Sequence, residues 1–512
     1  MQKINVFTKA KMFLWPIKQQ EMALFCPMAL MMFCLLFNFS ALRAVKDSLV
    51  VPSMGAEVIS FLKLWLVLPS AVIFTLIYIK LSNIYSMENV FYTVVVFFLL
   101  FFIFFAFIIY PHQILLHPSN IFVEKAIFTY PYLQWIIKIG GKWSYAIMYI
   151  FCELWSVVVI NLMYWQFVNN IFNIKDAKRF YPILGMIGNL GLIVAGNILI
   201  SCADTSEAPN LIVSNIIDCN CNNKSEITLK LIIIAVTFSG LIAIITFKYL
   251  NKIISKKQII IHKSNNLLSN FKLNYNRKTK LSIKDSINLV LKSKYIGCIA
   301  IMVICYGLAI NILEGPWKAK VRELYPTTQE YVSFMGQFNI AMGISCVAFM
   351  IISSNILRRF NWLVPALLTP TIIGITGIIF FLLVIVGNNI NTIFGTIISF
   401  NPIYFAVLIG ALQNILSKSS KYSLFDPTKE VAYIPLNDEL KTKGKAAVEV
   451  VGMKLGKSGG ACIQSTIFTI YPSATFDSIA TILMCVFILV ISIWLIDVIK
   501  LYHQYITLNH GQ

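Results

Sequence analysis

Long apolar runs follow one another from residue 23 to residue 501, separated by polar segments. A helix needs about 20 mostly apolar residues to cross a bilayer, and most of the runs reach that length. They predict an all-α membrane protein with about twelve transmembrane helices. The expected spans are 23–42, 59–79, 90–110, 143–168, 180–202, 227–250, 295–313, 334–354, 363–387, 393–416, 448–471 and 479–501.

The charges in the connecting segments predict the orientation. The segment 251–294, between the sixth and seventh spans, holds eleven Lys and Arg residues against one acidic residue. The segment 203–226 holds one Lys against four acidic residues. Because positively charged loops stay on the cytoplasmic side, the first segment is expected inside and the second outside. Both chain termini are then cytoplasmic.

The basic segment also divides the spans into six and six. This is the layout of major-facilitator transporters, in which two helical bundles surround a midplane site. A solvated linker that only sets the orientation is the simpler interpretation of the segment itself. The expected parts are a cytoplasmic N-terminus (1–22), an N-terminal six-helix bundle (23–250), a basic cytoplasmic linker (251–294), a C-terminal six-helix bundle (295–501) and a cytoplasmic tail (502–512).

Composition agrees with this class, since 58% of the 512 residues are hydrophobic and 12% are charged. The net charge of +20 lies largely in alternate loops, so nucleic acid is not an expected partner. No cleavable signal peptide is expected, because the first apolar run continues into a full span. Cys202, Cys219 and Cys221 flank or lie in one outer loop, where a disulfide and free thiols both stay open. The cysteine spacing fits no metal site, and no cofactor is expected.

Several charged residues lie where the pattern places lipid. Lys63 lies about one turn inside the second span, and Glu153 lies near the middle of the fourth. A charge at the bilayer centre costs roughly 2.5–3.5 kcal/mol on insertion scales, so an ionisable residue there is a candidate functional residue. For Lys63 the alternative is that its long side chain snorkels to the interface. For Glu153 the alternative is a structural ion pair.

Two further groups of charges follow the first helix of each half. Glu314 and Lys318 are four residues apart, so their side chains can meet on one helix face, although a surface ion pair would also explain them. Arg43 and Lys46, with Asp47, allow a similar local cluster. The segments LRAVKD and LEGPWKAK thus form a faint internal echo between the two halves.

The stretch KTKGKAAVEVVGMKLGKSGG, residues 441–460, runs into an apolar segment of only about half the spanning length. The eleventh helix must therefore begin earlier and carry Lys457 into or near the membrane. Glycines are frequent in this span and in the fifth, and glycine-interrupted spans at matching places mark a transporter's site. GMKLGKS is one residue short of a P-loop and does not follow a strand, so ATP hydrolysis is not expected. Glycine amides beside a Lys still suit a phosphate.

These residues stand in segments that resemble the ATP/ADP translocases of obligate intracellular bacteria and plastids. The resemblance covers nearly the whole chain and is most specific over 412–460. It is carried by AVKDSLVVPSMGAE, FLKLW, CELWSVVV, NLMYWQFVN, DAKRFYPILG, NILEGPWKAKVRELYP, LQNILSKSSKYSLFDPTKEVAYIPL and KGKAAVEVVGMKLGKSGG. The family's functional charged positions match Lys63 in FLKLW, Glu153 in CELW, Glu314 in NILEGPWK and Lys457 in LGKSGG. NILEGPW stands where NLVE is usual, a small departure from the commonest pattern. Members of the family divide among ATP/ADP exchange, transport of other ribonucleotides and proton-coupled uptake, so the preferred base and the coupling mode stay open.

The resemblance implies an antiporter, not an enzyme, that imports host ATP in exchange for ADP without hydrolysis. It would act as a monomer in the inner membrane of a bacterium, with the lipid bilayer and the two nucleotides as its partners. Lys63 and Lys457 would bind phosphate oxygens, and Glu153 and Glu314 would pair with these cations or contact ribose or base. The remaining candidates for the substrate site are Arg43, Lys46, Lys318 and Lys445. Uptake or exchange of GTP, CTP or UTP, with or without proton coupling, is one alternative, and a non-transporting membrane receptor is another.

Overall fold

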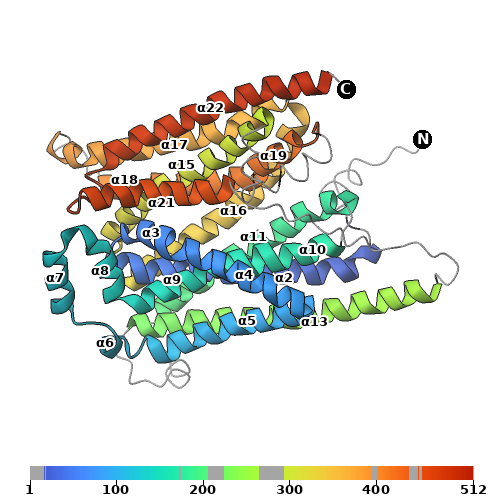
Figure 1. Ribbon diagram of the computed structural model, residues 1–512, viewed down its shortest axis with the longest axis horizontal. Helices are drawn as coiled ribbons and strands as arrows, with labels where there is room; N and C mark the ends of the chain where they lie inside the picture. Colours follow the sequence, from blue (N-terminus) through green and yellow to red (C-terminus); the bar gives the residue numbers. More distant parts are fainter. Residues whose placement is uncertain are drawn as a thin grey trace. The chain divides into compact units, whose positions relative to one another are not determined.

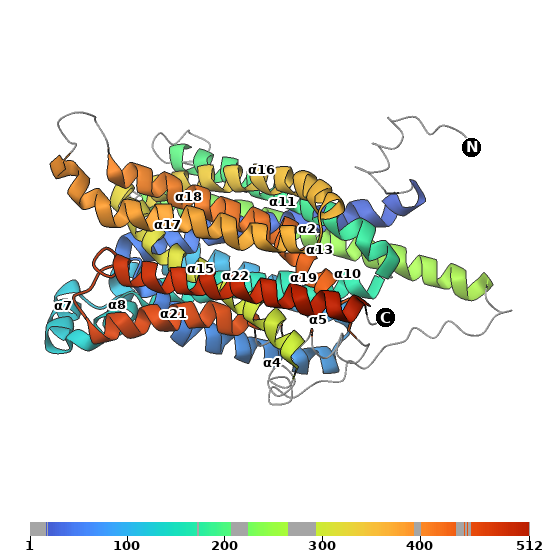
Figure 2. The same ribbon diagram turned by 90° about the horizontal axis from the view of Figure 1, so that it is seen from above.

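The computed structural model describes residues 17, 19–171, 174–205, 224–264, 293–393, 401–436, 445, 448 and 452–510. Every regular element in these ranges is a helix (Figures 1 and 2). Ten helical stretches of the described chain are long and apolar enough to cross a membrane, which confirms the predicted class. They are Glu21–Met54, Val58–Ile84, Met87–Ile109, Trp143–Asn169, Arg179–Asp204, Lys224–Ser255, Lys294–Leu324, Thr328–Leu357, Leu363–Gly387 and Ala480–Leu508.

The other two predicted spans, 393–416 and 448–471, correspond to the helices α18 (Pro402–Ser420) and α21 (Met453–Ile470). Helix α18 begins at Pro402 because the Asn401 side chain caps it, accepting hydrogen bonds from the amides of residues 403 and 404 at 3.2 Å. The calls for 394–400, 437–444 and 449–451 lie outside the described residues. So do Cys219 and Cys221, while Cys202 is a buried free thiol.

The chain forms two compact units. The first comprises Met1–Ala44, Ala71–Pro111 and Phe151–Thr279, as far as these are described. Its helices α5 and α13 run side by side (Figure 1). Its core is aromatic: Trp155 is fully buried against Phe98 and Phe102, and the Phe101 and Phe151 rings stack with centroids 3.7 Å apart. The elements that contribute to it are α2 (Gln19–Met54, first part), α4 (Leu68–Ile84), α5 (Met87–Phe104), η2 (Phe105–Ile109), η4 (Ser156–Tyr164), α10 (Trp165–Ile171), α11 (Ile174–Thr205) and α13 (Lys224–Ser264).

The second unit comprises Val45–Ser70, His112–Ile150 and Lys280–Gln512. Its helices α15, α17, α18 and α22 run side by side (Figures 1 and 2), and α3 and η1 pack on α21. The division of the chain into six-helix bundles at 23–250 and 295–501 stays a prediction. Besides α18 and α21, the unit contains α3 (Val58–Phe61), η1 (Leu62–Val67), α6 (Gln113–Leu116), α7 (Asn120–Thr129), η3 (Pro131–Leu133), α8 (Gln134–Gly141), α9 (Trp143–Trp155, first part), α15 (Lys294–Leu324), α16 (Thr328–Arg359), α17 (Leu363–Ile393), η5 (Lys421–Phe425), α19 (Asp426–Ala432) and α22 (Ala480–His510).

Glycines bring the same pair of helices together in each half of the sequence. In the first unit, a Cβ on Gly191 of α11 would lie 2.6 Å from the Phe33 carbonyl oxygen of α2. In the second unit, a Cβ on Gly456 of α21 would lie 2.9 Å from the Ile304 carbonyl oxygen of α15. Only glycine permits such a backbone approach. The fifth helix of each half thus packs on the first, as expected for an internal repeat.

The expected ends of the first and seventh spans, at residues 42 and 313, are wrong because both helices continue, to Met54 and to Leu324. Helix α15 continues through Pro316, which has no amide hydrogen to donate to the carbonyl oxygen four residues before it. That carbonyl, of Ile312, accepts a 3.3 Å hydrogen bond from Gln464 Nε2 of α21 instead. The charges expected just beyond the helices therefore lie inside them.

Candidate functional site

Five charged side chains of the second unit form a series in which positive and negative groups alternate. Lys46 Nζ lies 3.0 Å from Asp47 Oδ1, and Asp47 Oδ2 lies 2.9 Å from Lys318 Nζ. Lys318 Nζ also lies 3.1 Å from Glu314 Oε1. The other oxygen of Glu314, Oε2, lies 2.8 Å from Lys63 Nζ. We call these residues the ion series; it runs from α2 through α15 to η1.

The ion series has a buried end and an accessible end. The side chains of Asp47 and Lys318 are 0% exposed, whereas those of Glu314 and Lys63 are 13% and 20% exposed. At the buried end, Lys46 Nζ lies 4.1 Å from the centre of the Tyr149 ring, a cation–π contact. The five residues of the series are three lysines and two carboxylates.

The position of Lys63 follows from a local irregularity of its helix. The segment η1 is a π-helix, whose wider turn shifts the side chains that follow it and often occurs at functional sites. Lys63 Nζ donates to Glu314 Oε2 and, at 3.0 Å, to Asn311 Oδ1. It therefore does not snorkel away from the protein. The i,i+4 contact of Glu314 with Lys318 is confirmed, but Lys318 is buried, so the alternative of a surface pair is wrong.

Lys457 lies on the same side of α15 as Asn311. Its backbone nitrogen would be 3.1 Å from a Cβ on Gly307, and Asn311 Nδ2 donates to the Gly307 carbonyl oxygen at 2.9 Å. The Lys457 side chain is exposed. The close approach of α15 and α21 thus places Lys457 about one turn along α15 from the residue that holds Lys63.

Three other predicted site residues are not part of the ion series as described. Glu153 is half-buried and Arg43 is buried, and both belong to the first unit. Glu153 precedes another π-helical segment, η4, by three residues. Lys445 Nζ lies 2.6 Å from Glu430 Oε2, and these side chains are 40% and 47% exposed, so the pair contributes little to stability.

Sequence reasoning missed Asn311 and Tyr149 as members of the site. Asn311 is an uncharged polar residue three positions before Glu314, inside an apolar run, and that context could have singled it out. Tyr149 is fully buried under Lys46, and nothing in the pattern of its span distinguishes it from a packing residue. The pairing of Asp47 with Lys318 joins the two segments LRAVKD and LEGPWKAK, and the spacing within either segment does not predict it.

Comparison with known proteins gives one family. The family whose description reads "TLC ATP/ADP transporter" matches residues 1–505. The chain is 57% identical over 501 residues to ADP,ATP carrier protein 3 of Rickettsia bellii, covering 98% of each chain. It is 57% identical over 504 residues to ADP,ATP carrier protein 3 of Rickettsia prowazekii, again covering 98% of each. It is 42% identical over 507 residues to ADP,ATP carrier protein 1 of Rickettsia prowazekii, covering 98% of this chain and 97% of that one.

Solved structures share the fold at low sequence identity. One is a bacterial homologue of the iron transporter ferroportin in its inward-facing state, with a TM-score of 0.53 at 13% identity over 95% of this chain and 99% of that one. Another is the xylose transporter XylE from E. coli in an inward-open conformation, with a TM-score of 0.51 at 12% identity over 92% and 94%. These likenesses confirm the predicted major-facilitator-like fold.

Proposed function

Because the chain belongs to the TLC ATP/ADP transporter family, we propose that it exchanges ATP for ADP by alternating access, without hydrolysing either nucleotide. Its carrier relatives and its apolar helices make it a multi-pass membrane transporter rather than an enzyme. The observation that carries the proposal is the ion series, which presents Lys63, its most exposed lysine, at its accessible end. A polyphosphate supplies negatively charged oxygens that this lysine can bind.

Lys63 binds phosphate by exchanging one anion for another. Glu314 Oε2 lies 2.8 Å from Lys63 Nζ, and a phosphate oxygen is another charged acceptor for the same ammonium group. Lys457, exposed on α21, supplies a second cation for the phosphates. Arg43, Glu153 and Lys445 stay proposed contacts of the nucleotide. In this scheme Lys46 and Lys318 hold the carboxylates in place, so that Lys63 is never left without a counter-ion.

The same exchange couples binding to a conformational change. Glu314 is shared between Lys63 and Lys318, so a phosphate that takes Lys63 leaves both carboxylate oxygens of Glu314 to Lys318. There they compete with Asp47, whose contact with Lys318 joins segments from the two halves of the sequence. Weakening that contact favours opening on the side where it lies. Without a nucleotide, breaking it would separate two buried opposite charges at a cost of several kcal/mol, and exchange is therefore expected to be obligatory.

We propose that the protein lies in the inner membrane of a bacterium, with both termini in the cytoplasm. This orientation is supported by the excess of Lys and Arg in the segment 251–294. The Asp47–Lys318 contact then lies toward the outside, near the ends of the first and seventh helices. In this proposal ATP and ADP are the transported substrates, and the helices are surrounded by the lipid bilayer. The carrier acts as a monomer and binds no nucleic acid.

Uptake into nucleotide-loaded vesicles tests the proposal. Purified protein is reconstituted with ADP inside, and labelled ATP is added outside. Lys63→Ala and Lys457→Ala are each expected to abolish uptake, with the protein still in the membrane. Lys80→Ala is the matched control, since Lys80 is an exposed lysine on the same helical stretch, Val58–Ile84, and is expected to exchange normally.

Two results would overturn the proposal. Near-normal exchange in the Lys63 or the Lys457 variant would remove that lysine from the site. Uptake into vesicles that contain no nucleotide, abolished by an uncoupler, would replace exchange with proton-coupled import. Stoichiometric recovery of unhydrolysed labelled ATP inside the vesicles is expected in the wild-type protein.

A further inference from the structure

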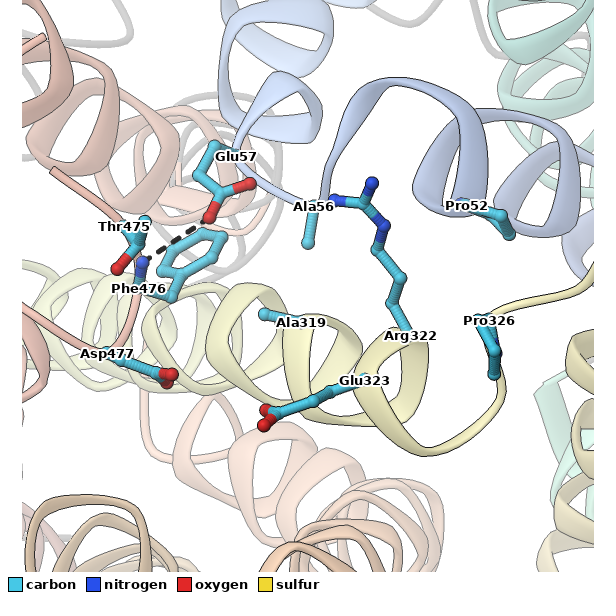
Figure 3. A pocket seen from close by; sticks show the side chains of 10 residues that line it. All are labelled: Pro52, Ala56, Glu57, Ala319, Arg322, Glu323, Pro326, Thr475, Phe476 and Asp477. Carbon is cyan, nitrogen blue, oxygen red and sulfur yellow. Dashed lines mark hydrogen bonds between the residues drawn. The ribbon is translucent and has the colours of Figure 1, made fainter. Parts of the chain in front are cut away.

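A polar cavity lies apart from the ion series, within the second unit. It has a volume of about 380 Å³ and is formed by the end of α2, the last turn of α15 and the segment before α22. Figure 3 shows Glu57 and the Arg322 guanidinium on one side of it, and Glu323 and Asp477 on the other. All of these segments follow helices that the charge pattern directs outward, so the cavity is expected to face the outside.

Arg322 lines one side of the cavity, and Lys138 and Lys142 of the neighbouring α8 region lie beside that side, within electrostatic reach of Arg322, without lining the cavity themselves. We call these three cations the positive wall. Burial lowers the pKa of Lys138, the Glu57 carboxylate raises it, and Arg322 lowers it again. Burial also lowers the pKa of Lys142, and Arg322 adds to this effect. These cations therefore crowd one another in a partly desolvated place.

A single carboxylate, that of Glu57, cannot neutralise the three cations. Glu57 Oε1 already accepts a 3.4 Å hydrogen bond from the Phe476 amide. Lys142 Nζ has a carbonyl, that of Ser53, at 3.5 Å, and Lys138 Nζ lies 4.3 Å from the centre of the Trp135 ring. Within the described part of the chain, no carboxylate oxygen lies within 4.0 Å of the charged nitrogens of these three residues.

The opposite wall is neutralised internally. Lys320 Nζ lies 2.8 Å from Glu323 Oε2 and 2.9 Å from Asp477 Oδ2, so one buried lysine holds both carboxylates. The carboxylates of Glu323 and Asp477 thus face Lys320, so the positive wall can bind an anion from outside the protein. A group with several negative oxygens fits that wall, since charge-assisted hydrogen bonds to Arg and Lys are the strong ones.

We propose that Arg322, Lys138 and Lys142 form an outer binding site for the phosphate groups of an arriving nucleotide, distinct from Lys63. The inference rests on the proposed function for the identity of the nucleotide, but not for the presence of an anion site. The site holds the polyphosphate at the mouth of the carrier and raises its local concentration before the outer side opens. Removing a cation there changes capture from outside and leaves the later steps alone.

Lysine footprinting tests the site without any transport. Purified full-length protein is treated briefly with acetic anhydride, with and without inorganic tripolyphosphate, and acetylation is read by mass spectrometry. Tripolyphosphate is expected to reduce acetylation of Lys138 and Lys142 at least about twofold, because a bound anion raises the protonated fraction of each amine. Lys125, an exposed lysine of α7 outside the cavity, is the control and is expected to stay unchanged. Equal acetylation with and without tripolyphosphate would overturn the proposal.

Exchange kinetics then test whether the outer site captures ATP from outside. Arg322→Gln is expected to raise the external KM for ATP roughly three- to tenfold with little change in maximal rate. Arg322→Lys, which keeps the charge, is expected to give a smaller rise and guards against a folding defect. Lys125→Gln is expected to match the wild type. An unchanged external KM in Arg322→Gln, while the wild type exchanges normally, would overturn the proposal but not the exchange function.

Two further measurements distinguish a nucleotide phosphate from a lipid phosphate, and the anion site from the exchange function. The Arg322→Gln effect is measured in vesicles with and without anionic lipid; an effect seen only with anionic lipid would reassign the site to a lipid headgroup. If wild-type protein moved no nucleotide, the exchange function would fail, and protection by tripolyphosphate would still decide whether the anion site exists.

Discussion

Replacing Glu314 by Gln separates a carboxylate that competes with the substrate from one that binds it. Glu314 Oε2 lies 2.8 Å from Lys63 Nζ, and the proposed phosphate needs the same ammonium group. In Glu314→Gln the amide keeps the shape of the side chain but not its charge, and Lys63 keeps its 3.0 Å contact with Asn311. Nucleotide binding is therefore expected to become tighter, and exchange is expected to become slower.

The exposure of the Lys63–Glu314 ion pair determines how much the nucleotide affinity is expected to change. Fully exposed ion pairs contribute about 0.2–1 kcal/mol, whereas breaking a buried pair costs about 3–5 kcal/mol. The Lys63 and Glu314 side chains are 20% and 13% exposed, which places the pair between these limits. We take about 1–2 kcal/mol for the interaction that a phosphate no longer has to displace, which corresponds to roughly 5- to 30-fold tighter binding.

The assay compares equilibrium binding of labelled ADP to purified protein with the exchange rate in vesicles. Glu314→Asp, which keeps the charge, is expected to bind near the wild-type value. Glu124→Gln, an exposed carboxylate of α7, is the control for charge alone. The double variant Lys63→Gln/Glu314→Gln is expected to bind no better than Lys63→Gln, because the gain acts through Lys63.

Weaker binding in Glu314→Gln would refute this reasoning. A loss as large as that of Lys63→Gln would show that the carboxylate contacts the ribose or the base of the nucleotide. Tighter binding that persists in the double variant would place the competition at a cation other than Lys63.

Three further outcomes follow from other contacts. Asp47→Asn and Lys318→Gln are each expected to lower the free energy of unfolding, measured in detergent, by an amount on the order of 3–5 kcal/mol. The double variant is expected to recover most of this loss, and additive losses would contradict the buried pair. Gly456→Ala is expected to reduce folded yield in size-exclusion profiles, since its Cβ would meet a carbonyl at 2.9 Å, whereas Gly140→Ala, with nothing within 4 Å, is expected to be silent. Burial and a nearby lysine lower the pKa of His117 below its ordinary value of about 6.5, so the stability of the wild type is expected to fall as pH drops below that value, and less so in His117→Gln; equal pH profiles would contradict this.

Hydropathy alone predicts where most helices lie. The spans expected at 59–79 and 227–250 correspond to the helical stretches Val58–Ile84 and Lys224–Ser255. A lone charge in such a run also marks Lys63 and Glu153, because the cost of burying it can be judged without a structure. The i,i+4 spacing further predicts the contact of Glu314 with Lys318.

The remaining features depend on contacts between distant segments. Asp47 and Lys318 are 2.9 Å apart, yet nothing in LRAVKD or LEGPWKAK specifies that the two would meet. The continuation of α15 through Pro316 depends on a hydrogen bond from Gln464, far along the chain. The π-helical turn that carries Lys63 has no residue signature of its own, because a single inserted residue leaves the apolar pattern almost unchanged.

The order of the charges decides what the ion series does. A series that ended on a carboxylate would repel an incoming polyphosphate, whereas this one ends on Lys63, its most exposed member. Because Glu314 touches both Lys63 and Lys318, a phosphate at the accessible end changes the balance at the buried end without contacting Asp47. In Glu314→Gln that connection is absent, so tight binding and slow exchange are expected together. Loss of Lys63 removes the point of entry, and binding and exchange are expected to fail together.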